Sequence, residues 1–430
     1  MNTASNIIDR VATRFAILCL ALLVAASDQI PGPPQKQPVA LTGATLHTVS
    51  GDVLEDATLV FADGVIVSIN GEIPADAEVI DATGKHVYPG LFEGATELGL
   101  VEIGAVRATR DQAEVGVMNP NVRAEVAVNP GSELIPTNRA NGILLSTTMP
   151  RGGVMSGQAA VLQLDGWTYE DMTLRSGAGM LLNWPNMRPS RAWWIEESAA
   201  EQLAERDRQL RVIEDALRLA KAYAADEDGE YDARWDALKP VLTGEMPLLV
   251  RANDVLQIEA AVAFAAAHEL RCVIVGGRDA LQCAALLAAN DVPVVLDGVH
   301  RNPARRDAPI DEPFTLPAKL KAAGVKFAIS SNRGTSFDRN LPYHAATAAA
   351  FGLSEADAIA AITLWPAQIY GVDDRVGSLE VGKHATLFVA DGDILAVPTQ
   401  VERAWINGRV VDLTSRHTML NEKYKRRLAE

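Results

Sequence analysis

Eight short apolar runs, separated by helical or loop-like stretches, recur between residues 89 and 329 of this 430-residue chain. This rhythm is typical of a parallel sheet whose strands are joined by crossover helices. Eight strands together with their intervening helices, over about 270 residues, match the size of a (β/α)8 barrel. The sequence therefore predicts an α/β protein with a TIM-type barrel over residues 89–370. The expected strands are Pro89–Thr96, Gly142–Met149, Ala159–Leu164, Met180–Trp184, Pro247–Val250, Arg271–Val275, Val292–Leu296 and Val325–Ile329.

The connections between these runs differ in character. Apolar residues recur at helical spacing in Glu196–Ala225, Asp254–Glu269, Ala280–Ala289 and Ser354–Thr363, which predicts helices there. By contrast, Gly99–Ala140 has few helix signals and contains several Pro, Asn and Gly residues. We expect that segment to form a long loop over one end of the barrel.

Both ends of the folded chain show short alternating strands instead. Residues 39–88 contain an Asp63-Gly64 pair and residues 371–415 contain an Asn407-Gly408 pair, and both pairs are hairpin signals. We expect the two segments to build one small β-sandwich. The Pro-rich residues 28–38 predict an extended linker, and the basic residues 416–430 predict a C-terminal tail with a solvated helix end.

The first 27 residues have the layout of a secretory signal peptide. Arg10 and Arg14 precede the apolar run Phe15–Ala26, and small residues follow it. The run is shorter than the roughly 20 apolar residues of a membrane span, although an uncleaved anchor is the alternative. We therefore expect secretion across the inner membrane into the periplasm. Cys272 and Cys283 lie in apolar runs and are expected to be buried free thiols.

Composition limits the partners of the chain. Hydrophobic residues are 48% and charged residues 22%, which is ordinary globular usage and excludes a mainly disordered chain or a multi-span membrane protein. The formal net charge of −16 repels phosphate backbones and anionic headgroups. We expect no nucleic-acid partner, and no membrane partner after signal cleavage.

Three stretches resemble the amidohydrolase superfamily, and within it the exported branch related to imidazolonepropionase. They are HVYPGLFEGATELGL, NPGSELIPTNRANGILLSTTMPRGGVMSGQAAVLQLDGW and GLSEADAIAAITLWPAQIYGVDDRVGSLEVGKHATLFVADGDIL. The last one is the most specific, because it resembles the family's return from the barrel into the small β domain. The resemblance implies a hydrolase of carbon–nitrogen bonds in cyclic or linear amides, in which zinc or another divalent metal activates a water molecule.

The expected metal ligands are missing from this sequence. The family's His-x-His falls on Ala95-Thr96-Glu97, its fifth-strand histidine on Arg251, its sixth-strand histidine near Gly276-Gly277, and its eighth-strand aspartate on Ser331-Asn332. Of these side chains only Glu97 coordinates metals in the usual way. The guanidinium of Arg251 has no lone pair to offer. We therefore expect a degenerate metal site and no bound metal cofactor.

Histidines elsewhere give a weak alternative. None of the seven forms a His-x-His or His-Glu-x-x-His arrangement. His300 and His344 follow the seventh and eighth expected strands, so these two are the ones expected near the pocket. Two unpaired loop imidazoles make a poor metal site.

Two functions remain open. In the first, the pocket keeps a hydrolytic role with other groups, and the candidates are Glu93, Glu97, Arg251 and Asn332, with Asn253, Asp297 and Ser331 nearby. Arg251 would then occupy the place of the metal and pair with Glu97. The alternative is that this pair is only a salt bridge that fills a metal site without function. In the second, the scaffold is a non-catalytic binding protein for a partner or for a small amide or dipeptide-like ligand. The resemblance also implies association into homo-oligomers.

Two local motifs carry less weight. The Gly-rich residues 151–158 lack the pattern of a phosphate-binding loop and are interpreted as a tight connection. Trp193 and Trp194 precede a helix, where paired tryptophans more often cap a core than face a partner.

Overall fold

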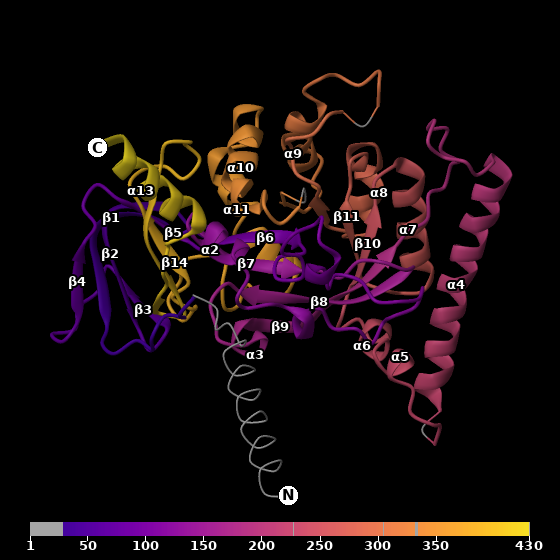
Figure 1. Ribbon diagram of the computed structural model, residues 1–430, viewed down its shortest axis with the longest axis horizontal. Coiled ribbons are helices and arrows are strands. Elements are labelled where there is room, and N and C mark those ends of the chain that lie inside the picture. Colours follow the sequence, from indigo (N-terminus) through magenta and orange to yellow (C-terminus); the bar gives the residue numbers. More distant parts are fainter. Residues whose placement is uncertain (1–28, 227, 304, 332–333, 430) are drawn as a thin grey trace, which may run out of the picture. The chain divides into compact units, whose positions relative to one another are not determined.

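The computed structural model describes residues 29–226, 228–303, 305–331 and 334–429. The expected signal peptide lies outside the described residues. Residues 31–430 form one compact unit containing two eight-stranded sheets (Figure 1). Among the residues described, no helix has both the length and the apolar composition needed to cross a membrane.

The first sheet joins the two ends of the folded chain, as the sequence predicts. Its order is β16-β15-β14-β5-β1-β2-β3, with β4 paired to β1. Its strands are β1 (Val39–His47), β2 (Val53–Ala62), β3 (Val65–Ile69), β4 (Glu78–Asp81), β5 (His86–Pro89), β14 (Leu387–Ala390), β15 (Val401–Ile406) and β16 (Arg409–Val410). Phe61 on β2 and Trp405 on β15 pack edge to face at 5.5 Å, so distant strands of this sheet face each other across one core.

The second sheet forms the barrel, and it contains all eight predicted strands. Its order is β13-β12-β11-β10-β9-β8-β7-β6. The strands are β6 (Leu91–Thr96), β7 (Ile143–Thr148), β8 (Met155–Gln163), β9 (Thr173–Asn183), β10 (Leu248–Ala252), β11 (Cys272–Gly276), β12 (Val294–Leu296) and β13 (Phe327–Ile329).

One strand departs from the all-parallel barrel. β8 pairs antiparallel with both β7 and β9, whereas the other pairings in this sheet are parallel. The reason is the length of the connection, since only Met149–Val154 separates β7 from β8 and a parallel crossover needs a dozen or more residues. Residues 151–154 of the Gly-rich segment are therefore part of a tight connection, as expected, whereas residues 155–158 already belong to β8.

The barrel is nearly closed between β6 and β13. The backbone of residues 361–362 lies at this seam, where Phe92 N donates to Ile362 O at 2.8 Å and Ile329 N donates to Ala361 O at 2.9 Å. These two hydrogen bonds satisfy backbone N–H groups of β6 and β13 that would bond to each other's strand if β6 and β13 paired directly. The seam is therefore bridged by the chain that precedes the last barrel helix.

The described helices lie outside the barrel, most of them packed against it. They are α2 (Leu134–Arg139), α3 (Tyr169–Met172), α4 (Ala199–Ala225), α5 (Ala233–Asp236), α6 (Lys239–Leu242), α7 (Val255–Ala267), α8 (Ala284–Ala289), α9 (Glu312–Ala322), α10 (Leu341–Ala350), α11 (Glu355–Ala360), α12 (Leu364–Ile369) and α13 (Arg416–Ala429), with 3-10 turns η1 (Arg107–Thr109), η2 (Ala124–Ala127), η3 (Ala280–Cys283) and η4 (Asp338–Asn340). The four predicted helices are present. Ser198 and Glu201 form a capping box that starts α4. Gly99–Ala140 is mainly irregular, as expected.

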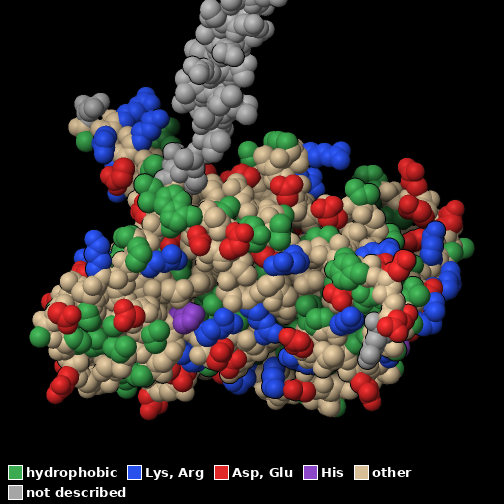
Figure 2. Space-filling view, turned by 90° about the horizontal axis from the view of Figure 1, so that it is seen from below, with side chains coloured by type: hydrophobic (Ala, Val, Ile, Leu, Met, Phe, Trp, Pro, Cys, Tyr) green, Lys and Arg blue, Asp and Glu red, His purple; other side chains and the backbone are tan. Residues whose placement is uncertain are grey.

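The surface is uneven in charge and polarity. In Figure 2, acidic and basic side chains alternate over the centre of the face, while acidic and apolar side chains dominate its left-hand part, where Figure 1 places β2, β3 and β4. Trp193 and Trp194 are 91% and 67% exposed. They therefore do not cap a core, and that interpretation of the sequence is wrong.

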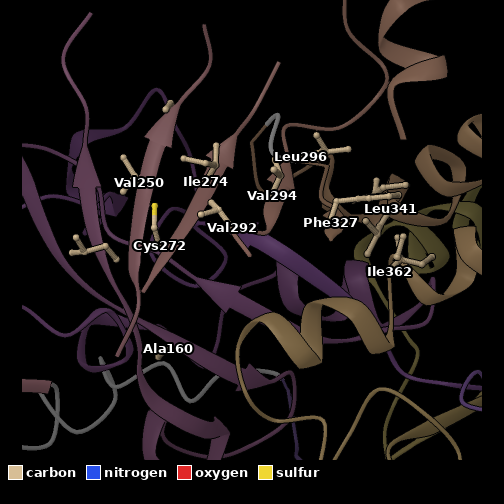
Figure 3. Close-up of a cluster of buried hydrophobic side chains, with 14 of the residues drawn as sticks. Ala160, Val250, Cys272, Ile274, Val292, Val294, Leu296, Phe327, Leu341 and Ile362 are labelled. Atoms are coloured by element: carbon tan, nitrogen blue, oxygen red, sulfur yellow. The ribbon is translucent and has the colours of Figure 1, made fainter. Parts of the chain in front are cut away.

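Each barrel strand contributes to two cores. Val250, Ile274, Val294 and Phe327 are register partners on β10 to β13 and belong to the core beneath the helices (Figure 3). Their alternate neighbours, which include Leu249, fill the barrel interior. The buried free thiols expected at positions 272 and 283 are confirmed.

Candidate functional site

The carboxyl ends of the parallel barrel strands meet at one rim, which is the mouth of the barrel. A cavity of about 460 Å³ opens there. It is lined by Arg151, Gly152, Asn183, Arg251, Asn253, Val275, Arg278 and Asp297. Six of these eight residues have charged or amide side chains, so the cavity suits a polar ligand. Ligand sites of barrel enzymes occur at this end of the fold.

Arg251 lies on β10, two residues after Leu249, and strand alternation turns both side chains toward the barrel interior. Its guanidinium makes no hydrogen bond or ion pair with any residue that the structure describes, and its Nε atom is buried without a partner. Burial, together with the nearby charge of Arg151, lowers the pKa of Arg251 to about 10. The nearby Asp297 carboxylate opposes this lowering of the pKa but does not pair with the guanidinium. The group stays cationic at neutral pH, so it is a largely buried positive charge without a direct ion-pair or hydrogen-bond partner among the described side chains.

Glu97 pairs with Arg151, not with Arg251 as expected. The correction follows from strand order. Glu97 follows β6, Arg151 follows the adjacent strand β7, and Thr96 is the register partner of Thr148. Arg251 is on β10, three strands beyond β7. The Glu97 side chain is 15% exposed and Arg151 is 51% exposed, so this ion pair lies at the edge of the mouth and leaves Arg251 without a direct ion-pair partner.

Asn253 places a second unsatisfied polar atom in the cavity wall. Its Oδ1 is buried and has no partner among the described residues. It lies against Gly276, where a Cβ would come within 2.6 Å of that oxygen. Asn183 has a different role, because its Nδ2 donates to Gly153 O and Ser156 Oγ, both at 2.9 Å. Asn183 therefore braces the β7–β8 connection, whereas Asn253 is left for a ligand.

Glu93 is fully buried at the seam and does not line the cavity. Its carboxyl accepts from Ser331 N at 3.1 Å and from Ala95 N at 3.3 Å, and it contacts Ser330 Oγ. Burial and the neighbouring Asp338 carboxylate raise the pKa of Glu93. Glu93 therefore joins the end of β6 to the end of β13.

Asp338, which the sequence did not single out, completes this network. It accepts a hydrogen bond from Ser331 Oγ at 2.8 Å and another from Thr96 Oγ1. Burial raises the pKa of Asp338 as well. The candidate Asn332 lies outside the described residues. A buried pair of carboxyl groups thus supports the mouth from below.

Tyr370 also reaches the barrel interior without having been expected there. Its hydroxyl donates to Gly94 O at 2.6 Å, and burial raises its pKa. This side chain comes from the end of α12 and packs near Phe92. It fills the barrel floor and does not line the mouth cavity.

The described donors do not fit a divalent metal of the kind that the resemblance implies. Among them, no group of three or more His, Cys, Asp or Glu side chains is placed to hold a metal ion. His344 Nδ1 accepts from Val299 N at 3.0 Å, and His300 Nε2 lies 2.8 Å from Thr347 Oγ1. Both imidazoles are engaged in local hydrogen bonds, while the cavity itself is lined by three guanidinium groups.

Sequence comparisons find similarity to amidohydrolases and related enzymes over parts of this chain. The amidohydrolase family model matches residues 251–412. The chain is 22% identical over 441 residues to amidohydrolase tasK of Hapsidospora irregularis, covering 90% of this chain but 42% of that protein. It is 39% identical over 82 residues to imidazolonepropionase of Micrococcus luteus, covering 18% of this chain and 20% of the enzyme. An allantoinase of Desulfitobacterium hafniense matches 49 residues at 51% identity, which is 11% of each chain.

Solved structures share the fold. An amidohydrolase from Thermotoga maritima MSB8 has a TM-score of 0.77 and 24% identity, covering 87% of this chain and 99% of that one. A Xaa-Pro dipeptidase with bound methionine has a TM-score of 0.54 and 15% identity, covering 87% of this chain and 100% of that one. The barrel and the small β domain thus have the fold of a solved amidohydrolase, and residues 251–412 of this chain match the amidohydrolase family.

Proposed function

We propose that the mouth of the barrel binds a small molecule that carries a carboxylate next to an amide, as an N-acyl amino acid or a dipeptide does. The observation that carries this proposal is the partly buried guanidinium of Arg251, which has no partner among the described residues and lines a polar cavity. Burying a charge without a counter-ion is unfavourable. A bound carboxylate would remove that penalty and accept two parallel hydrogen bonds from the guanidinium.

Asn253 explains why an amide should accompany the carboxylate. Arg251 lies on β10 and Asn253 directly follows that strand, and both residues line the same cavity. The Arg251 side chain offers donors, and Asn253 Oδ1 needs one. A ligand with an acceptor and a neighbouring N–H group satisfies both residues at once.

We further propose that this binding needs no resident divalent metal. Metal-activated water requires imidazole and carboxylate ligands that leave one coordination position open. At the positions where the superfamily places such ligands, this chain has Ala95, Arg251 and Ser331, and Glu97 is already paired with Arg151. The proposed site is therefore a binding site without the metal-hydroxide chemistry of the superfamily.

Hydrolysis without a metal is the second candidate, because one carboxylate does line the cavity. Asp297 follows β12, and its Oδ2 lies 3.3 Å from Arg278 Nη2. A carboxylate at this place has the chemistry to accept a proton from a water molecule that attacks a bound amide. Slow turnover that is lost in Asp297→Asn, with ligand affinity retained, would favour this candidate over binding alone.

Calorimetric titration with N-acetylglycine and glycylglycine tests the binding proposal. We expect Arg251→Met to weaken binding at least about tenfold, because a charge-assisted hydrogen bond contributes about 1.5–3 kcal/mol. Arg251→Lys should bind more tightly than Arg251→Met. The carboxamide N-acetylglycinamide is the matched ligand control and should bind weakly to the wild type. Equal affinity for acid and carboxamide would contradict the proposal.

Elemental analysis of the purified protein tests the metal-free part separately. We expect less than stoichiometric zinc, and no gain in turnover of N-acyl dipeptides on adding zinc. Stoichiometric metal with zinc-stimulated turnover would overturn it.

We also propose that the protein is exported to the periplasm, supported by the layout of residues 1–27. Amino-terminal sequencing of the protein recovered from the periplasmic fraction should give a start near residue 28. A full-length chain confined to the cytoplasm would contradict export.

A further inference from the structure

The C-terminal helix α13 lies on the surface with no buried residue. It carries five Lys or Arg side chains and one acidic residue, Glu422, between Arg416 and Ala429. Leu420, Tyr424 and Leu428 recur every four residues, which places them on one helix face. They are 39%, 52% and 88% exposed. The helix therefore presents both an apolar stripe and a concentrated positive charge to solvent.

The charge of α13 is hardly compensated within its own chain. Only Lys425 forms an ion pair with a described residue, and its partner Glu422 is on the same helix. At the start of α13, His417 Nδ1 lies 2.8 Å from Arg339 Nη1, and the helix also contacts α2. The basic second half of the helix thus has no acidic partner on the described body.

A surface of opposite character lies on β2, β3, β4 and their turns. Residues 50–84 contain eight Asp or Glu and no Lys or Arg, and all eight acidic side chains are exposed. Val53, Val67, Ile73 and Val79 are 51%, 45%, 40% and 58% exposed on the same segment. We call residues 50–84 the acidic strand surface. Its carboxylates form no ion pair with any described residue, and Figure 2 shows acidic and apolar side chains together in this region.

The acidic strand surface also offers an open sheet edge. β4 pairs with β1 alone, over Val39–Thr42, and has no strand on its other side among those described. Natural proteins protect such edges with charge, and Glu78 and Asp81 do this on β4. The edge therefore favours a basic partner over a second acidic strand.

We propose that α13 of one copy docks on the acidic strand surface of a second copy of this chain. The apolar stripe of Leu420, Tyr424 and Leu428 would cover exposed apolar side chains beside the β4 edge, such as Val79, while the surrounding Lys and Arg face the carboxylates there. Two-fold symmetry allows both helices to dock at once, which closes the assembly as a dimer. This self-association is independent of the ligand proposed for the barrel mouth.

The net charge of −16 does not prevent this contact. Charges more than about 8 Å apart are largely screened at physiological ionic strength, so the local charges of helix and strands decide the interaction. The helix supplies the excess of positive charge that the acidic strand surface lacks. The contact should consequently weaken as salt is added.

Light scattering coupled to size exclusion tests the proposal on the full mature chain. We expect a dimer at low salt, with the dimer dissociation constant rising at least about tenfold between 50 and 500 mM NaCl. The triple variant Lys423→Glu, Arg426→Glu, Arg427→Glu should be monomeric. The reversal Arg208→Glu, Arg211→Glu, Arg218→Glu on exposed α4 changes the net charge equally and should leave the dimer intact.

A charge exchange makes the test decisive. The variant Glu72→Lys, Glu78→Lys, Asp81→Lys should also be monomeric, and mixing it with the reversed-helix variant should restore a dimer containing one copy of each. A monomeric wild type at low salt would overturn the proposal, and so would failure of the mixture to associate. Binding of the wild type to phosphatidylglycerol vesicles in place of dimer formation would assign α13 to a membrane surface and overturn it as well.

Discussion

The hydrogen-bonding groups around the Glu93 carboxyl group are best satisfied when that carboxyl group carries a proton. Ser330 Oγ contacts Glu93 Oε1 and also lies 3.0 Å from Ala95 O, yet a hydroxyl has one hydrogen to donate. A protonated Glu93 donates to Ser330, which then donates to Ala95. Asp338 keeps hydroxyl donors from Thr96 and Ser331 and can remain charged. Hydrogen-bond geometry and the raised pKa of Glu93 therefore agree.

This proton makes stability depend on pH. In the unfolded chain the Glu93 carboxyl titrates near its ordinary pKa of 4.5, whereas in the folded protein its pKa is raised. The folded state thus binds the proton more tightly, and the stabilisation is lost as pH rises above 4.5 through the raised value. We expect the free energy of unfolding to fall between pH 5 and 9, with a slope of at most about 1.4 kcal/mol per pH unit from this group. Denaturant titrations across that range measure it.

Glu93→Gln provides the matched variant, because its amide N–H₂ can donate to Ser330 as the protonated acid does. We expect the variant to fold and to lose most of this slope. Asp338→Asn removes the neighbouring charge and should reduce the slope without abolishing it. An unchanged slope in Glu93→Gln would show that the pH dependence has another origin.

At the scale of the strand, the end of β11 is shaped to position Asn253. Gly276 has φ = 112°, a region that favours glycine, and a Cβ there would meet Asn253 Oδ1 at 2.6 Å. Gly276→Ala should displace Asn253 and weaken binding of N-acetylglycine roughly tenfold, since one buried hydrogen bond is worth about 1 kcal/mol or more. Gly382→Ala is the control, because Gly382 has φ = 94° and no atom within 4 Å of the added Cβ.

Gly382→Ala should lower stability by backbone strain alone and leave ligand affinity unchanged. Calorimetry and thermal unfolding of both variants separate strain from displacement. Equal loss of affinity in the two variants would mean that Gly276 acts only through general destabilisation.

The barrel strands could be located from the sequence because each is an apolar run bounded by turn residues. The direction of β8 could not be predicted. The run Ala159–Leu164 is apolar on both faces, and a strand buried on both faces has the same apolar pattern whether it runs parallel or antiparallel to its neighbours. Its direction depends on the short connection from β7. The association of the two chain ends in one β domain was predicted from their shared hairpin signals, but the pairing of β5 with both β1 and β14 was not.

The site was predicted in part for a similar reason. Arg251 was found because it stands at a strand end where the superfamily has a metal ligand. The sequence did not show that Arg251 and Glu97 are unpaired, because the pairing of side chains across a barrel depends on which strands are adjacent. Arg151 and Asp338 come from a connection and a 3-10 turn, where no periodic pattern indicates which way a side chain faces.

At the scale of the molecule, one buried carboxylate ties the barrel to the terminal sheet. Asp165 follows β8 and accepts from Arg139 Nη1 of α2 at 2.9 Å and from Gly32 N at 3.1 Å, and it lies 3.5 Å from Arg409 of β16. Its side chain is 1% exposed and that of Arg139 is 5% exposed. The Asp165 carboxylate therefore contacts three segments that are far apart in sequence.

Asp165→Ala should destabilise the protein strongly, because it leaves Arg139 buried without its main counter-ion, and breaking a buried pair costs about 3–5 kcal/mol. Amide exchange should accelerate in β16 and around Gly32 before it does so in β10 or β11, since the lost contacts hold the terminal segments. Asp291→Ala removes an exposed pair with Lys326, whose side chains are 77% and 69% exposed, and should cost less than about 1 kcal/mol. If Asp165→Ala were as mild as that control, the terminal sheet would be held to the barrel by apolar packing alone.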